Sequence, residues 1–149
     1  MVYAENKKAR FDYQALETFE GGIVLSGQET KSVREGGAKL QGAYLVIRAG
    51  EVWLLGCHIA PYSKAGKPEG VDPTRTRKVL LNRGEITQLI GKIQQKGLTL
   101  VPFSLYPRGH RVKLSFGLCR GKKAHDKRET LKARDIDRST RRVMRGEDE

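Results

Sequence analysis

The stretch from Arg111 to Arg120 alternates between apolar and polar residues, and this period of two constrains the fold more than any other feature. Its apolar members are Val112, Leu114, Phe116 and Leu118. Successive side chains of a strand point to opposite faces of a sheet, so the alternation predicts a strand with one face in a core. The segment therefore indicates a mainly β fold.

A second long strand is predicted over residues 11–25. Its alternation changes frame before Leu16, and Gly21 and Gly22 interrupt its second half. Interruptions of this kind indicate a bulge or a sharp bend within one strand. Gly27 marks the end of the run.

Two further regions complete the predicted sheet. Residues 43–55 are typical of a hairpin whose strands meet at the tight turn Ala49-Gly50. Residues 99–103 predict another strand, in which Pro102 favours a sheet edge or a bulge because proline has no N–H to donate. Together these segments predict a sheet that is antiparallel in the main.

Two short helices are predicted beside the strands. One spans residues 28–35 and ends at a pair of glycines. The other begins at Asn82, a good N-cap with Glu85 three residues later, and stops at Gly97. Its apolar face follows helical spacing and consists of Ile86, Leu89, Ile90 and Ile93.

These elements imply an antiparallel β-barrel of the oligonucleotide-binding (OB-fold) type, with about six strands and two short flanking helices. The 149 residues suit one domain with an appendage. We expect residues 1–120 to form the barrel and residues 121–149 to form a basic tail. Residues 61–76 hold three of the five prolines and predict a loop, which at this length is usually functional or disordered.

The chain carries 29 Lys and Arg against 17 Asp and Glu, a net charge of +12. Such an excess predicts a polyanionic partner, because each phosphate that Lys or Arg neutralises releases counterions. Residues 1–119 hold 18 basic and 10 acidic side chains, a net charge of +8. Residues 120–149 hold 11 basic and 7 acidic side chains, a net charge of +4 in only 30 positions.

The C-terminal segment has little to bury. Its apolar side chains follow no helical stripe and are Leu131, Ile136, Val143 and Met144. Such a segment cannot offset its ordering entropy alone, while its scarcity of glycine and proline leaves a helix accessible. We expect a tail that is disordered when free and helical on a partner. The alternative is a solvated tail without a function.

The sequence also lacks the marks of a secreted or membrane protein. No apolar run approaches the roughly 18 residues that span a bilayer, and residues 1–10 hold no apolar signal-peptide core. Cys57 and Cys119 are too few for a disulfide framework and fit a reducing cytosol. We therefore expect a cytoplasmic protein with no membrane partner.

Catalytic and metal-binding motifs are scarce as well. Adjacent residues of a strand point to opposite faces, so the thiol of Cys57 and the imidazole of His58 cannot easily meet, and Cys57 is better explained as a core residue. The Cys and His residues lack zinc-ligand spacing, and no P-loop, G-x-G-x-x-G motif or acidic magnesium cluster occurs. We expect no enzymatic activity, no cofactor and no metal.

Basic residues gather where loops meet the predicted barrel. The three clusters are Lys7, Lys8 and Arg10; Arg75, Arg77 and Lys78; and Arg120, Lys122 and Lys123. Loop ends at the rim of such a barrel bind nucleic acid, so these side chains would contact phosphates without reading the RNA sequence. Tyr62, Tyr106 and His125 are candidates for stacking on bases. The alternatives are solvated surface charges and, for the aromatic rings, places in the core.

Several motifs of the sequence occur together in one known family. They are residues 6–13 (NKKARFDY), 17–25 (ETFEGGIVL), 29–34 (ETKSVR), 72–82 (DPTRTRKVLLN) and 121–128 (GKKAHDKR). In this order, and over nearly the whole chain from about Asn6 to Met144, they resemble the SsrA-binding protein family, also called small protein B. Agreement of separate motifs is far more specific than any single one.

The resemblance implies an OB-type barrel that binds transfer-messenger RNA (tmRNA) at its tRNA-like domain and delivers it to stalled ribosomes for trans-translation. It implies a tail that folds in the empty mRNA channel and probes small-subunit rRNA at the decoding centre of the 70S ribosome. Elongation factor Tu would join the delivery complex, and the protein would be a monomer. One alternative is a general rRNA- or tRNA-binding OB-fold protein. A second, a nucleic-acid-modifying enzyme, rests only on Cys57 and His58.

Residue by residue, the resemblance implies RNA contacts by Glu20, Leu80 and Asn82. Further expected RNA-binding side chains are Lys7, Lys8, Arg10, Lys31, Arg34, Arg75, Arg77 and Lys78. The expected ribosome-binding tail residues are Gly121, Lys122, Lys123, His125, Asp126, Lys127, Arg128, Val143 and Met144. Without RNA, Asn82 is explained as a helix cap and Leu80 as a core residue. Because a carboxylate repels phosphate, we expect Glu20 to accept hydrogen bonds from base or ribose donors.

Overall fold

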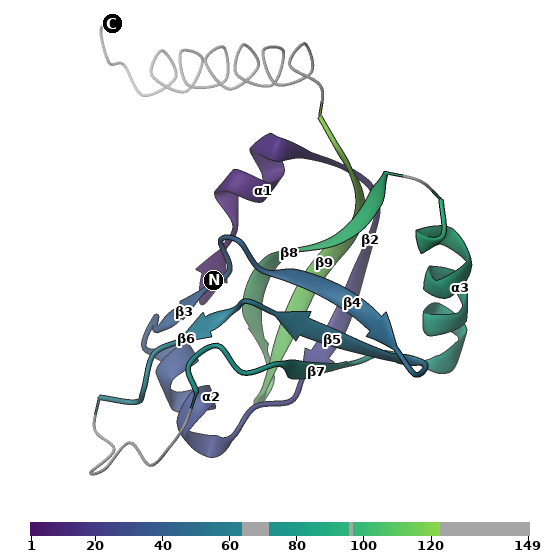
Figure 1. Cartoon of the computed structure of the whole chain (residues 1–149). Coiled ribbons are helices and arrows are strands. Elements are labelled where there is room, and N and C mark those ends of the chain that lie inside the picture. The colour runs from purple at the N-terminus through teal and green to yellow at the C-terminus, as the bar shows by residue number, and fades with distance from the viewer. Residues whose placement is uncertain (64–71, 96, 123–149) are drawn as a thin grey trace, which may run out of the picture.

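Six strands of the chain form a closed antiparallel barrel (Figure 1). The computed structural model describes residues 1–63, 72–95 and 97–122. The barrel strands are β2 (Tyr13–Ile23), β4 (Tyr44–Arg48), β5 (Glu51–Leu55), β7 (Arg77–Leu80), β8 (Leu98–Arg108) and β9 (Arg111–Gly121). They pair in the order β8–β4–β5–β7–β2–β9, and the ring closes where β9 pairs back with β8.

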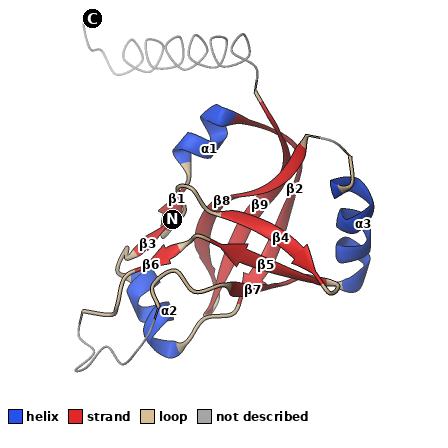
Figure 2. Cartoon of the chain, viewed as in Figure 1, coloured by secondary structure: helices blue, strands red, loops and turns tan. Residues whose placement is uncertain are grey.

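Short strands and helices surround the barrel (Figure 2). The two-residue strands are β1 (Ala4–Glu5), β3 (Ala38–Lys39) and β6 (His58–Ile59). The helices are α1 (Lys7–Asp12), α2 (Gly27–Arg34) and α3 (Arg83–Ile93). Strand β1 pairs with β8, and β3 pairs with β6 in a separate small sheet. The prediction of a mainly β, antiparallel barrel with about six principal strands is confirmed.

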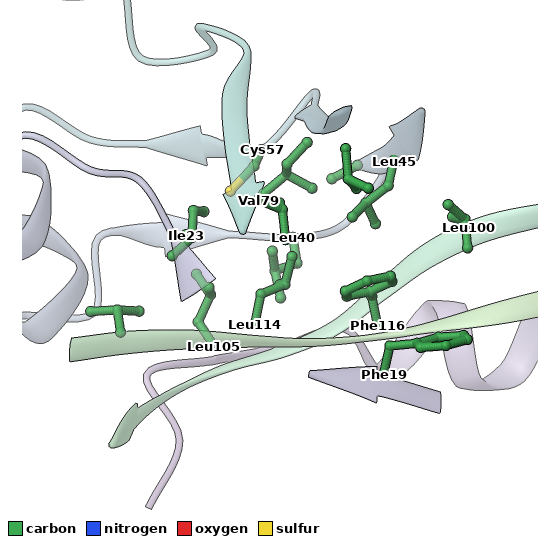
Figure 3. Packing of buried hydrophobic residues seen from close by; sticks show 14 of the residues in the cluster. Phe19, Ile23, Leu40, Leu45, Cys57, Val79, Leu100, Leu105, Leu114 and Phe116 are labelled. Carbon is green, nitrogen blue, oxygen red and sulfur yellow. The ribbon is translucent and has the colours of Figure 1, made fainter. Parts of the chain in front are cut away.

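The alternating apolar residues of β9 form one wall of the core. Val112, Leu114, Phe116 and Leu118 are all less than 7% exposed. The rings of Phe116 and Phe19, the latter on β2, stack with their centroids 5.7 Å apart (Figure 3). Burial of such side chains is the main favourable term in folding, so the period of two in this strand directs the barrel to close around them.

Strand β2 has one irregularity in register. Its pairing with β9 shifts between Ala15 and Glu17, at the frame change seen in the sequence. The pairing then continues without a shift through Gly21 and Gly22, so of the predicted bulge or sharp bend at the glycine pair no bulge occurs in the pairing with β9. A Cβ atom at Gly21 would lie 2.7 Å from Cγ1 of Val79. Glycine is therefore needed there because β7 approaches β2 closely.

The bulge in β8 and the turn between β4 and β5 agree with the sequence predictions. The register of β8 with β9 shifts between Pro102 and Ser104, which confirms the bulge that the proline favoured. At the turn between β4 and β5, Ala49 and Gly50 have φ angles of 52° and 74°. Two consecutive positive φ angles match the twist of the flanking strands, as a tight hairpin requires.

Helix α1 lies where the sequence predicted the beginning of a strand, and that part of the prediction is wrong. Asn6 caps the helix: its Oδ1 accepts a hydrogen bond from the N–H of Ala9 at 3.2 Å. Its Nδ2 donates to the carbonyl oxygens of Leu40, at 3.2 Å, and Pro102, at 3.0 Å. These carbonyls come from distant parts of the chain, so tertiary contacts anchor this one-and-a-half-turn helix.

Helices α2 and α3 agree with the prediction. In α3, Oδ1 of Asn82 accepts a hydrogen bond from the N–H of Glu85 at 2.8 Å, as expected of an N-cap. Leu89 is completely buried, whereas Ile90, assigned to the same apolar face, is 37% exposed. The face of α3 that packs on the barrel is therefore narrower than the apolar face that the sequence predicts.

The barrel extends slightly beyond its predicted end. Gly121 pairs with Tyr13, and the N–H of Lys122 donates to the carbonyl oxygen of Asp12 at 2.9 Å. The first residues assigned to the tail are therefore attached to the barrel. The other predicted tail residues lie outside the described part of the chain: Lys123, His125, Asp126, Lys127, Arg128, Val143 and Met144.

Candidate nucleic-acid interface

One row of residues crosses four neighbouring strands on the outside of the barrel. Leu80 on β7 pairs with Gly22 on β2, Gly22 pairs with Lys113 on β9, and Lys113 pairs with Tyr106 on β8. Glu20 lies two residues before Gly22 and therefore shares its face of β2. We refer to this surface, with Arg108 at its edge, as the four-strand face.

Glu20 is held in place by two side chains of β8. The hydroxyl of Tyr106 donates a hydrogen bond to Oε2 of Glu20, and Nη1 of Arg108 lies 3.2 Å from Oε1. Partial burial and the neighbouring Glu20 carboxylate raise the pKa of Tyr106 to about 12, which keeps the phenol protonated as a donor. The Glu20 side chain remains 35% exposed. Its oxygens are thus oriented and still accessible to further donors.

Leu80 and Asn82 lie at the junction of β7 and α3, and Leu80 pairs with Gly22, two residues after Glu20. Leu80 is 52% exposed, so the alternative that it fills the core is wrong. Asn82 is exposed, and its Oδ1 caps α3. Its side-chain NH₂ makes no hydrogen bond to the described residues. Capping and RNA binding are therefore compatible, because they use different atoms of the amide.

A buried ion cluster fastens the loop before β7 to helix α2. Glu29 is 3% exposed and accepts hydrogen bonds from the guanidinium groups of Arg75 and Arg77. Nη2 of Arg77 lies 2.6 Å from Oε2 of Glu29. Burial alone would raise the pKa of Glu29, but hydrogen bonds from Arg75, the N–H of Ser26 and Arg77 outweigh it and lower the pKa to about 2.

The structure overturns the prediction that Arg77 contacts RNA. Its side chain is completely buried, and besides Glu29 it donates to the carbonyl oxygens of Cys57 at 2.7 Å, Pro73 at 3.0 Å and Arg75 at 3.1 Å. A buried charge whose donors all bond to acceptors within the protein stabilises the fold. The sequence could not reveal this, because Glu29 is 48 residues away.

The other cations of this region remain at the surface to different degrees. Arg75 is 38% exposed although it binds Glu29, and Lys78 is 38% exposed while Nζ contacts Glu51 at 2.9 Å. On α2, Lys31 lies 5.6 Å from the centroid of the Tyr62 ring. Arg34, also exposed, donates to the carbonyl oxygen of His110 at 3.2 Å.

A second basic region lies at the other end of β2. Lys7, Lys8 and Arg10 are exposed on α1, and Nζ of Lys122 donates to the carbonyl oxygen of Arg10 at 3.1 Å. Arg10 also contacts Glu5 at 3.2 Å. We refer to this region as the α1 end. Helix α1 joins the start of β2, nine residues before Gly22, so the two regions lie roughly 30 Å apart along an extended strand.

The cysteine and histidine that could have suggested catalysis point to opposite sides. Cys57 is fully buried and His58 is exposed, as their adjacency predicted. Burial raises the pKa of the Cys57 thiol to about 11, and it raises the pKa of Cys119 equally, so neither thiol is activated. Within the described residues no three His, Cys, Asp or Glu side chains are placed to hold a metal, and no helix is long and apolar enough to cross a membrane.

Sequence reasoning missed part of the four-strand face. The sequence motifs do not indicate Gly22, Arg108 and Lys113 as site residues, and they suggest Tyr106 only for stacking on bases. For Lys113 a signal existed: it occupies an outward position of the alternating segment. Its neighbours, however, follow only from the register of β9 with β2 and β8.

Comparison with known proteins identifies relatives along almost the whole chain. A family model described as SmpB protein matches residues 3–146. An SsrA-binding protein of Gloeothece citriformis is 52% identical over 144 residues, covering 97% of this chain and 93% of the relative. One from Coprothermobacter proteolyticus is 51% identical over 143 residues, covering 95% of each chain.

A solved structure agrees with the fold. A chain from a structure described as "tmRNA-SmpB: a journey to the center of the bacterial ribosome" is 48% identical, with a TM-score of 0.68. The match covers 80% of this chain and 84% of the other. The sequence identity, the family model and the shared fold agree: this chain belongs to the SmpB family of SsrA-binding proteins.

Proposed function

We propose that this protein binds tmRNA through the four-strand face of its barrel and delivers it to stalled ribosomes for trans-translation. One observation carries the proposal: Glu20, Leu80 and Asn82 lie on one exposed surface of a chain that is 48% identical to a chain in the tmRNA–SmpB structure. Sequence identity of this extent supports a shared RNA partner.

The four-strand face offers three kinds of contact in a small area. The carboxylate of Glu20 accepts hydrogen bonds from base or ribose donors, and Leu80 supplies an apolar contact. Arg34, Arg75 and the lysines Lys31 and Lys78 add positive charge nearby for phosphates. Acceptors and apolar contacts read bases and shape, whereas the cations supply attraction that does not depend on sequence.

The α1 end and the tail form the second part of the proposed mechanism. The part of the tail beyond Lys122 folds as a helix in the empty mRNA channel, where it probes small-subunit rRNA at the decoding centre. Helix α1, which carries Lys7, Lys8 and Arg10, lies beside the end of β9, because Lys122 donates to the carbonyl oxygens of Arg10 and Asp12. Elongation factor Tu joins the delivery complex. The protein acts in the cytoplasm as a monomer and has no enzymatic activity of its own.

Competition binding tests the proposal. Labelled tmRNA and an excess of bulk tRNA are mixed with the full chain at physiological salt, because phosphate attraction alone does not discriminate between them. We expect a clear preference for tmRNA. Equal binding of the two RNAs would support the alternative of a general tRNA- or rRNA-binding protein.

Two variants of Glu20 test the chemistry of the contact. Glu20→Gln retains an acceptor and should keep much of the affinity for tmRNA, whereas Glu20→Lys should lose most of it. If both variants lose affinity equally, the carboxylate does not act as a hydrogen-bond acceptor for base or ribose.

A further inference from the structure

A groove of about 430 Å³ lies on the four-strand face, where Gly22, Leu80 and Lys113 line it. Gly22 and Leu80 line one part of it, together with Val24, which follows the last residue of β2. His110, Arg111 and Lys113 line the side formed by the β8–β9 turn and β9. A drug-sized ligand pocket begins at about 300 Å³, so the groove has room for one nucleotide.

Gly22 creates the hollow in this row of residues. A Cβ atom at this position would lie 3.8 Å from the Cβ of Leu80 and 3.8 Å from Nζ of Lys113, both ordinary van der Waals distances. The φ angle of Gly22 is not positive, so the backbone does not require glycine. This contrasts with Gly21, where a Cβ would collide with Val79. The absent side chain at Gly22 therefore leaves open space between an apolar residue and a cation.

The chemistry of the groove is complementary to a nucleotide. Leu80 and Val24 are 52% and 44% exposed, which leaves apolar surface for the flat face of a base. Arg111 and Lys113 make no ion pair with the described residues, whereas the neighbouring Arg108 and Lys78 are paired with Glu20 and Glu51. Two unpaired cations beside an apolar hollow suit a phosphate attached to an unstacked base.

We propose that one unstacked nucleotide of the bound RNA enters this groove, with its base over Gly22 and Leu80 and its phosphate between Lys113 and Arg111. The inference rests on the proposed function and adds a specific site to it. Glu20 lies on the same strand, two residues from Gly22, and accepts a hydrogen bond from the adjacent nucleotide. The groove admits single-stranded or looped RNA and excludes a base that stays stacked in a duplex.

Gly22→Leu, Arg111→Met and Lys113→Met test the groove in the full-length protein, with binding of labelled tmRNA measured across a salt series. Each cation variant should lower affinity roughly tenfold and reduce the slope of log K against log salt by about 0.7. Gly22→Leu should lower affinity without changing this slope, because it fills the hollow and removes no charge.

Matched controls carry the same chemical changes elsewhere. Arg48→Met removes an exposed cation at the β4–β5 turn, across the barrel from β2. Gly91→Leu adds the same side chain to α3 at a position where a Cβ has no neighbour within 4 Å. Circular dichroism and thermal unfolding establish that all variants are folded. If the groove variants bind tmRNA with the same affinity and salt dependence as their controls, the groove does not hold a nucleotide. The proposed function still stands in that case, provided that wild type prefers tmRNA to bulk tRNA.

A crosslink identifies the occupant. A photoreactive benzoylphenylalanine in place of Val24 should crosslink to one looped nucleotide of tmRNA, and Gly22→Leu should suppress this product. Crosslinks to duplex regions only, or to a ribosomal protein in place of RNA, would contradict the proposal. Failure of wild type to prefer tmRNA would instead defeat the proposed function itself.

Discussion

The two ends of strand β2 carry different chemistry, although both are basic. At the α1 end, Lys7, Lys8 and Arg10 are exposed ammonium and guanidinium groups beside the exit of the tail. At the four-strand face, cations stand next to the oriented carboxylate of Glu20 and exposed apolar surface at Leu80. Cations alone attract any polyanion, whereas the second combination can discriminate between RNAs. Net charge therefore accounts for RNA attraction at the α1 end but does not reveal the carboxylate and apolar contacts of the four-strand face.

Arg77, at the start of β7, is a third kind of cation, which is structural. Arg77→Met should destabilise the protein by about 3–5 kcal/mol, since it removes one partner of a buried ion pair and leaves carbonyl acceptors unpaired. Chemical denaturation measures the loss, and tmRNA binding by the folded fraction should change little. Wild-type stability combined with lost RNA binding would show that Arg77 belongs with the exposed cations after all.

The same cluster predicts a pH dependence. The pKa of Glu29 is about 2 in the folded protein against 4.5 as its ordinary value. Its stabilisation, about 3 kcal/mol, is therefore present above pH 4.5 and is lost as the pH falls from 4.5 through 2. Denaturation of wild type and Glu29→Gln between pH 7 and pH 2 isolates this contribution. A stability difference between them that is independent of pH would contradict the assignment.

The Tyr106→Phe variant removes the hydrogen bond that orients Glu20 and changes no charge on the four-strand face. Loss of one hydrogen bond should weaken tmRNA binding by about 1 kcal/mol, a fivefold effect. The salt dependence of binding should stay the same, because no phosphate contact is removed. Tyr3→Phe is a matched control on another part of the chain. An equal effect of both variants would show that Tyr106 does not orient Glu20.

The smallest effect on RNA binding is expected from removal of the tail. A chain that stops after Lys122 keeps the hydrogen bonds from this residue to Asp12 and Arg10. It should bind tmRNA within about twofold of wild type but fail to support tagging in a translation assay. Equal loss of both activities would mean that barrel and tail do not act separately.

Much of the barrel could be predicted because its signals are local. The period of two in β9, the hairpin turn at Ala49 and Gly50 and the cap of α3 by Asn82 each depend on residues close in the sequence. Helix α1 could not be predicted, because its capping residue Asn6 is anchored by hydrogen bonds to carbonyls of distant segments.

The candidate site was predictable only in part, for the same reason. The family resemblance pointed to Glu20, Leu80 and Asn82, which the structure places on one surface. Whether an arginine faces water or a buried carboxylate depends on long-range packing, so the sequence alone does not show that Arg77 binds Glu29. Lys113 became visible only when the strand register placed it beside Gly22.

The most direct test of the contrast between the two ends is the ratio of affinities for tmRNA and bulk tRNA. The ratio is measured at physiological salt for wild type, for Glu20→Lys and for the double variant Lys7→Met/Lys8→Met. The double variant should weaken binding of both RNAs and leave the ratio unchanged, whereas Glu20→Lys should reduce the ratio roughly tenfold. The account would be contradicted if the affinity ratio fell in Lys7→Met/Lys8→Met and stayed at the wild-type value in Glu20→Lys.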